Sequence, residues 1–195
     1  MVGEAARLTR ALGLLACVAL APVAAAAGSN DLPAWVINAS CRDGAPQGPY
    51  QLRTPDGRLR VAGAFNNGKR TGSFIFWSND GVRVAHVPYD EDERNGTVAT
   101  WYPGRPGAEP ARRFESAWRR GRREGLTRSW YADGRRRAET EYAGGALVTT
   151  TGWSDTGTQL GDEAARALAQ RDAEAADAEY AELDRLVREH LPRCD

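Results

Sequence analysis

Few residues of this chain carry the side chains of familiar catalytic chemistry, and they stand far apart. His86 and His190 are the only histidines, and neither is spaced from a cysteine as metal ligands are. The sequence has no Gly-x-Ser-x-Gly, no His-Glu-x-x-His and no glycine-rich phosphate loop. The acidic run "YDEDER", residues 89–94, lacks the alternating ligands and central glycine of an EF-hand and indicates a solvated turn. We therefore expect no catalytic residue, no metal site and no cofactor.

The residues that could do chemistry are arginines accompanied by tryptophans. Eleven arginines stand against four acids between positions 105 and 137, whereas residues 155–195 hold eleven acids and five arginines. Guanidinium groups beside aromatic rings bind anions such as lipid headgroups, polysaccharide or an acidic protein surface. The interpretation we favour is internal neutralisation, with the acidic segment lying along the basic one, and anion binding is the alternative. The candidate anion- or partner-binding face comprises Trp101, Trp118, Trp130, Arg119, Arg120, Arg122, Arg123, Arg135, Arg136 and Arg137.

Composition and the N-terminus indicate one exported domain. The 195 residues are 42% hydrophobic and 27% charged with zero formal net charge, so no overall field recruits nucleic acid. Residues 1–27 read as a signal peptide, because two arginines precede an apolar run that ends in small residues. We expect a periplasmic or secreted protein with no nucleic-acid partner. In the alternative, "LLAC" is a lipobox, and membrane attachment would follow only if Cys17 is lipidated.

Removal of the signal peptide leaves two cysteines, Cys41 and Cys194, near the two ends of the mature chain. An even pair in an exported protein predicts one disulfide. The alternative is two free buried thiols.

The elements that must position these residues repeat along the chain. Copies start at Gly48, Gly72, Gly96 and Gly125, with spacings of 24, 24 and 29 residues. In three copies a large aromatic residue stands five residues after the starting glycine, and in three copies a glycine suited to a turn stands nine residues after it. An aromatic residue stands seventeen residues after the starting glycine in all four copies, once five extra residues in "PGRPGAEP" are allowed for in the third. A partial fifth copy spans 148–161 with Trp153 and Gly157. Such self-similarity indicates an array of small units.

Each unit is typical of a β-hairpin. In "GSFIFWSNDGVRVAHVPYDEDERNG" a β-branched and aromatic run meets an Asn-Asp-Gly turn, and a second run returns. Alternation places the positions 11, 13, 15 and 17 residues after each starting glycine on one face. That face collects Leu59, Val61, Phe65, Ala85, Val87, Tyr89, Phe114, Trp118, Ala138 and Tyr142. The sequence predicts a mainly β fold, an antiparallel β-hairpin meander of four to five units.

The pattern of glycine, aromatic, "DG", aromatic and "FNNGKRTG" (65–72) resembles the bacterial MORN-like repeats, named for membrane occupation and recognition nexus. The resemblance covers residues 48 to about 157. It implies a β-hairpin array that binds partners or lipids, and no catalytic activity. Members of this branch are often labelled antitoxin components of toxin–antitoxin systems.

After Gly161 the composition changes to Ala, Glu and Arg without Gly or Pro until Pro192, which predicts one long helix. An apolar stripe at helical spacing comprises Leu168, Ala175, Ala176, Tyr180, Leu183, Val187 and Leu191. We expect the stripe to pack on the sheet; the alternative is a coiled-coil seam.

The expected organisation is a signal peptide (1–27), a lead-in (28–47), the repeats (48–161) and an amphipathic C-terminal helix (162–192). The expected function is that of a non-enzymatic interaction or scaffold module of the cell envelope, with an unknown protein or an anionic envelope component as partner. Two alternatives remain open. One is an antitoxin-like protein-binding module, and the other is a polysaccharide-active enzyme, which would need two carboxylates about 5 to 10 Å apart in a cleft.

Overall fold

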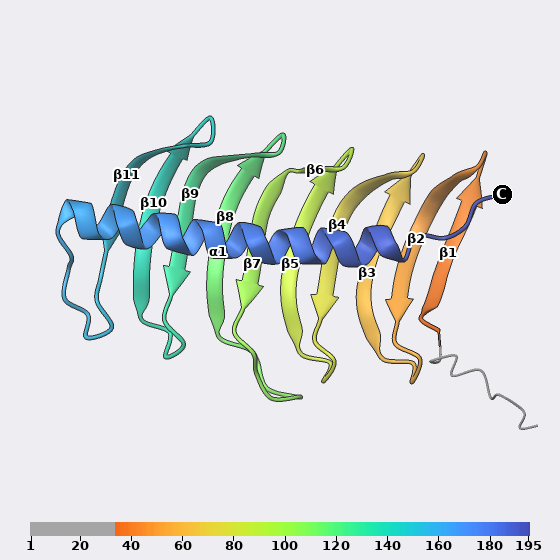
Figure 1. Cartoon of the computed structure of the whole chain (residues 1–195), viewed down its shortest axis with the longest axis horizontal. Coiled ribbons are helices and arrows are strands. Elements are labelled where there is room, and N and C mark those ends of the chain that lie inside the picture. The colour runs from red at the N-terminus through yellow and green to blue at the C-terminus, as the bar shows by residue number, and fades with distance from the viewer. Residues whose placement is uncertain (1–33) are drawn as a thin grey trace, which may run out of the picture. The chain divides into compact units, whose positions relative to one another are not determined.

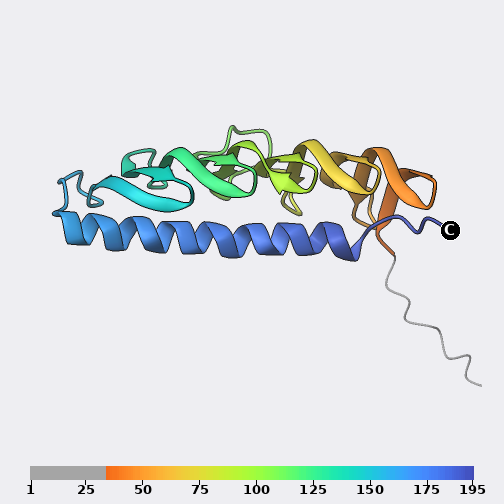
Figure 2. The same ribbon diagram turned by 90° about the horizontal axis from the view of Figure 1, so that it is seen from above.

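The structure is a computed structural model that describes residues 34–195, all of which belong to one compact unit. The expected signal peptide and Cys17 lie outside the described residues. One antiparallel sheet follows chain order, with a long helix on one of its faces (Figures 1 and 2). The elements are β1 (Val36–Arg42), β2 (Ala45–Arg53), β3 (Leu59–Asn66), β4 (Lys69–Trp77), β5 (Arg83–Asp90), β6 (Glu93–Arg94), β7 (Gly96–Trp101), β8 (Arg112–Arg119), β9 (Arg122–Trp130), β10 (Arg136–Ala143), β11 (Ala146–Gly152) and α1 (Asp162–Glu189).

This architecture confirms the predicted mainly β meander followed by a helix. The sheet starts at Val36, inside the range taken as a lead-in, because β1 pairs with β2 along its whole length. The helix ends at Glu189, three residues before the expected end at 192. Among residues 34–195, no helix combines the length and the apolar character needed to cross a membrane.

Two kinds of turn alternate at the two ends of the strands. The strand ends at the top of Figure 1 are called the upper edge below, and those at the bottom the lower edge. The upper edge in Figure 1 carries two-residue turns with positive φ at both positions, such as Asn67 (49°) and Gly68 (79°). This is the conformation of type I′ hairpin turns, whose twist matches that of the strands. The lower edge carries longer loops closed by a glycine at positive φ, Gly57, Gly81, Gly134 and Gly157. The last of these confirms the turn of the partial fifth copy.

The glycine that starts each repeat lies at a β-bulge. Its φ is positive in all four copies, from 67° at Gly72 to 118° at Gly96. The strand register shifts by two residues around it, for example between the pairs Ala62↔Ile75 and Ala64↔Thr71. Because a side chain at positive φ is strained, the bulge explains the recurrence of glycine at this position.

The face that alternation predicted is the buried one, and α1 covers it. Val61, Phe65, Val87, Tyr89 and Trp118 are all buried beneath or beside the helix. Leu168, Ala176, Tyr180 and Val187 of the predicted helix stripe are buried against the sheet and Leu183 packs there in part, as expected. Ala175 is exposed, and Leu191 is exposed because it lies beyond the end of α1. The side chains of α1 that are buried are Ala165, Leu168, Ala169, Ala173, Ala176, Tyr180 and Val187.

The core changes in character along the array. At its N-terminal end the rings of Tyr50, Phe65, Phe74 and Tyr89 meet edge to face, with centroids 5.3 to 5.6 Å apart in the T-shaped pairs. Toward its C-terminal end hydroxyl pairs take some of the buried positions, as between Ser116 Oγ and Thr127 Oγ1 at 2.7 Å, while Trp118 and Tyr142 remain buried aromatic residues. The alanine-rich half of α1 covers the hydroxyl end, where small side chains let the helix approach the sheet closely.

Three contacts fasten the C-terminal end of α1 to the first strands. Tyr50 Oη donates a hydrogen bond to the carbonyl oxygen of His190 at 2.9 Å, and the His190 ring packs on Trp35. Cys41 and Cys194 form the expected disulfide, with their Cα atoms 5.6 Å apart. Such a bond fits an oxidising, extracytoplasmic compartment.

Candidate functional site

Arginine side chains of the repeats take two very different places, facing the helix or standing at the turns. The first group occupies one repeat position, two residues before the starting glycine, in Arg70, Arg94 and Arg123. Each is paired across the strands with the aromatic seventeen residues into a copy, namely Phe65, Tyr89 and Trp118. These arginines therefore point toward α1.

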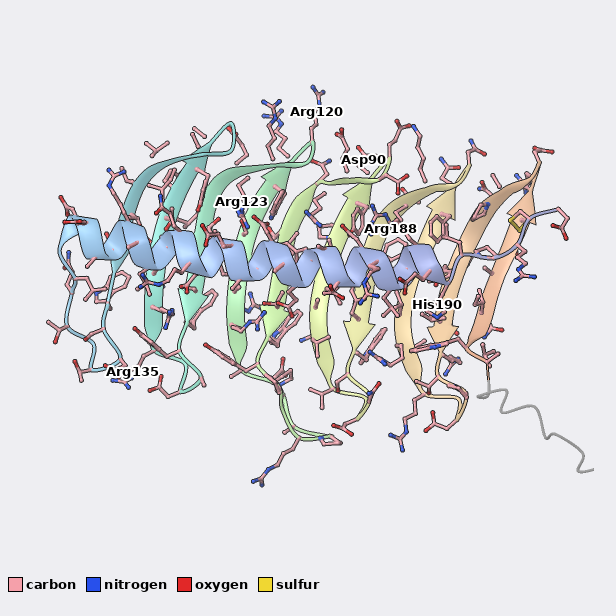
Figure 3. The ribbon with its side chains drawn as sticks, viewed as in Figure 1. Asp90, Arg120, Arg123, Arg135, Arg188 and His190 are labelled. Carbon is pink, nitrogen blue, oxygen red and sulfur yellow. A yellow bond between two sulfur atoms is a disulfide. The ribbon has the colours of Figure 1, made fainter. Side chains whose placement is uncertain are left out.

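Carboxylates of α1 receive these arginines. Asp184 accepts from Arg70 Nη1 at 2.5 Å, from Arg94 Nη2 at 2.7 Å and from Tyr89 Oη at 2.5 Å. All three charged side chains are less than a fifth exposed. Arg123 donates hydrogen bonds from both terminal nitrogens to Asp177, at 3.0 and 2.8 Å. Figure 3 shows Arg123 next to α1.

Each of these guanidinium groups also lies over the aromatic ring of the next copy. The distances from guanidinium carbon to ring centroid are 4.0 Å for Arg70 on Tyr89, 5.2 Å for Arg94 on Trp118 and 5.7 Å for Arg123 on Tyr142. A partly desolvated cation over a ring gains electrostatic attraction. Burial raises the pKa of Tyr89, so its hydroxyl stays neutral and donates to Asp184. These ion pairs and cation–π contacts hold α1 against the repeats.

The structure does not bring the ten residues of the predicted face to one surface. Trp118 is buried beside Tyr180 of α1, and Trp101 is buried under Arg83. Arg123 pairs with Asp177 and Arg137 with Asp172, both on the helix, so these two arginines are neutralised internally as expected.

Arg135 and Arg136 stand near the lower edge and are paired within the sheet. Arg135 bonds Asp133, and Arg136 bonds Glu139 at 2.6 Å. Figure 3 shows Arg135 at the lower edge and Arg120 at the upper edge, on opposite sides of the sheet.

Arg119, Arg120 and Arg122 remain as a basic turn between β8 and β9. All three are exposed, and within residues 34–195 none forms an ion pair. Arg119 and Arg122 are directly opposite each other across the strands, with Arg120 at the tip. Like charges placed directly opposite destabilise a strand pair. An anion bound here would relieve that repulsion.

The turn before the basic turn along the upper edge is acidic. Asp90 and Glu93 are opposite each other there, and Asp92 at its tip bonds Arg70. The predicted solvated turn at 89–94 is thus a hairpin turn in this structure. The negative charge of this acidic turn would repel an anion, so an anion would be attracted only at the basic turn.

Trp130 belongs to a small cavity between α1 and the lower part of the sheet. The cavity measures about 220 Å³, and its lining residues include Tyr102, Arg113, Trp130, Arg137 and Asp172. Tyr102 Oη donates to the carbonyl oxygen of Trp130 at 2.7 Å. Asp172 accepts from Ser129 Oγ at 2.6 Å and from Arg137 Nε at 2.9 Å. Asp172 is the one carboxylate of this lining, so the cavity lacks the carboxylate pair that a glycosidase needs.

Each histidine ring has a polar neighbour within the fold. His86 Nε2 lies 2.9 Å from Ser73 Oγ, and burial, with a smaller effect of Arg83, lowers the pKa of His86. His190 Nδ1 lies 2.9 Å from the carbonyl oxygen of Leu186. In the described part of the chain, no three His, Cys, Asp or Glu side chains gather as metal ligands.

No protein-family model and no curated protein sequence matches this chain. The structure itself defines only a class of fold, an antiparallel β-hairpin meander covered by one C-terminal helix.

The sequence analysis did not single out Arg70, Arg94 and Asp184, which form the ion-pair cluster between α1 and the sheet. A signal was present, because "RTG", "RNG" and "REG" repeat an arginine at the same distance before the starting glycine. The position of Asp184 on the helix had no comparable pattern.

Proposed function

We propose that this protein is a non-enzymatic, exported repeat scaffold of the MORN-like kind that binds an anionic component of the cell envelope. The basic turn, Arg119, Arg120 and Arg122, is the binding site. The observation that carries the proposal is that these three arginines are exposed and unpaired within residues 34–195, whereas Arg123 and Arg137 are neutralised by α1.

Export is part of the proposal. Its supports are the signal-peptide pattern at 1–27 and the Cys41–Cys194 disulfide, which is at home in an oxidising compartment. The meander supports a scaffold role, because an array of stacked hairpins offers long edges and faces for contacts.

The test measures binding of the mature protein to vesicles containing phosphatidylglycerol and, separately, to dextran sulfate. The two probes distinguish a lipid headgroup from a polysaccharide as the source of the anion. The variant Arg119→Gln/Arg120→Gln/Arg122→Gln removes the basic turn. Each arginine near an anionic surface contributes about 1 kcal/mol, so the variant should bind the preferred probe roughly 100-fold more weakly at low salt.

A matched control removes three exposed arginines elsewhere, with Arg166→Gln/Arg171→Gln/Arg188→Gln on α1. The control changes net charge equally and should bind much as the wild type does. Equal loss in both variants would indicate a general charge effect and contradict a site at the basic turn. Absence of binding to both probes by the wild type would overturn the anionic partner.

A further inference from the structure

The cavity beneath α1 lies beside a second series of β-bulges, near the lower edge. In each copy the register of the two strands that meet at the lower loop shifts by one residue. The extra residue is Arg60, Val84, Arg113 and Arg137 in the four copies. A bulge re-aims side chains, and in the last two copies it aims an arginine at the helix. Arg113 forms an ion pair with Glu179 of α1, and Arg137 forms one with Asp172.

The helix leaves room beside these two arginines, because its residues there are alanines. Ala175 and Ala176 line the cavity together with the buried ring of Phe114. Its volume of about 220 Å³ exceeds the roughly 150 Å³ of an apolar cavity that holds benzene. The cavity is therefore large enough for a benzene-sized body that carries one small polar group.

The carboxylate of Asp172 is already occupied by donors of the protein. It accepts from Ser129 Oγ at 2.6 Å and from Arg137 Nε at 2.9 and 3.0 Å, and its side chain is only 13% exposed. A cationic ligand would have to displace one of these donors, so the lining does not favour a cation.

The guanidinium groups, in contrast, keep donors to spare. Arg137 uses Nε for Asp172, and within residues 34–195 its Nη1 and Nη2 have no hydrogen-bond acceptor. Arg113 pairs with Glu179 through Nη2, and in the same part of the chain its Nε and Nη1 have none. Terminal N–H groups of a planar guanidinium bind a carboxylate through paired hydrogen bonds. The lining thus offers charged donors next to an apolar wall.

We propose that this cavity is a binding site for a small organic carboxylate. The carboxylate of the ligand accepts hydrogen bonds from Arg137 and Arg113, and its apolar body lies against Phe114, Ala175 and Ala176. The site is separate from the basic turn, which stands at the upper edge, and it does not depend on the function proposed for that turn.

Benzoate is the probe for this site. Benzamide serves as a neutral analogue of nearly the same shape, and inorganic phosphate as an anion without an apolar body. Titration calorimetry of the mature protein should show one saturable benzoate site and roughly tenfold or more weaker binding of the other two probes, since each lacks one of the two features. Absence of saturable benzoate binding would overturn the proposal. Equal binding of benzamide would contradict recognition of the carboxylate, and tighter binding of phosphate would contradict a role for the apolar wall.

Ala175→Leu tests the location without touching either arginine. The larger side chain is placed at an exposed helix position that lines the cavity, so benzoate should bind roughly tenfold or more weakly while the melting temperature stays near that of the wild type. The matched control, Ala178→Leu, makes the same change at an exposed position of α1 outside the lining and should bind benzoate as the wild type does. Equal loss of binding in the two variants would overturn the assigned site.

Arg137→Lys tests the contact with the carboxylate. Lysine keeps the positive charge beside Asp172 but lacks the planar fork of N–H donors, so benzoate binding should weaken while the fold is retained. An unchanged benzoate affinity in this variant would contradict the paired hydrogen bonds assigned to Arg137.

Discussion

At the scale of single residues, the arginines divide by the carboxylate that each one meets. Asp184 collects two arginines and the Tyr89 hydroxyl in a site that is largely shielded from water. A buried charge is tolerated only when it is paired and hydrogen-bonded, so the members of this cluster depend on one another. The basic turn has no such constraint, and its arginines are available to a partner.

Asp184→Ala should strongly destabilise the fold. The change leaves Arg94 partly buried without a carboxylate and leaves Arg70 with Asp92 alone, and breaking a buried pair costs about 3–5 kcal/mol. Guanidinium-induced unfolding measures the loss. Glu182→Gln is the matched control, because Glu182 forms an exposed pair with Arg185 and should cost at most about 1 kcal/mol. Equal losses in the two variants would refute a special role for the Asp184 cluster.

Alkaline pH should unfold the protein as its tyrosines ionise. Burial raises the pKa of Tyr50, Tyr89 and Tyr180 above the ordinary value of 10.0, whereas the unfolded chain ionises near that value. The stability that these neutral phenols contribute is therefore complete below pH 10.0 and is lost as the pH rises toward the raised pKa values. Phenolate absorbance and circular dichroism should change together for this group. Complete phenol ionisation with native dichroism would contradict the burial argument.

At the scale of elements, α1 acts as a brace across the hairpins. Its carboxylates contact β4, β6, β9 and β10, and its C-terminal tail is tied to β1 by the disulfide. Hairpins in an array contact mainly their neighbours. A helix that contacts several copies adds long-range connections that the array alone does not have.

The double variant Cys41→Ser/Cys194→Ser should fold but lose stability. The disulfide joins residues 153 positions apart, for which the chain-entropy model gives at most about 5 kcal/mol. The Asp184 cluster and the Tyr50–His190 hydrogen bond remain, so the dichroism of the helix should persist at room temperature. Thermal unfolding with and without reductant measures the effect. A wild-type protein with the same melting temperature in both conditions would contradict the expected contribution.

At the scale of the whole molecule, opposite charges of the two halves of the chain meet across the sheet–helix interface. The arginine-rich repeats and the acidic helix therefore cancel much of each other's charge, and the basic turn is a local exception at the upper edge. The disulfide connects the first strand of the sheet to the tail after the helix, which ties together the two ends of the described region, residues 34–195.

The exported protein should contain no free thiol and should lack residues 1–27. Under the proposed export, cleavage near Ala27 would remove Cys17, and the remaining two cysteines are bonded to each other. Intact mass and thiol titration under denaturing, non-reducing conditions check both points. Protein recovered from the cytosol with residues 1–27 intact would contradict export, and an acylated Cys17 would favour the lipoprotein alternative.

The sequence by itself determined the hairpin meander, its buried face and the helix. The reason is that these features are local and repeated: a starting glycine at the bulge of each of the four copies, a glycine in each lower loop and alternation along the strands that carry the core. The even cysteine pair likewise predicted the disulfide without a structure. The sequence also placed basic and acidic charge in separate segments.

Only the tertiary structure decided which charges meet. Arg122 and Arg123 are neighbours in sequence, yet the first stands exposed beside a turn and the second pairs with Asp177, because adjacent residues of a strand point to opposite faces. Trp101 and Trp118 seemed equally available for binding and are both buried. The phase of α1 on the sheet selects Asp172, Asp177 and Asp184 as partners of the arginines, since long-range packing sets that phase and no local pattern encodes it.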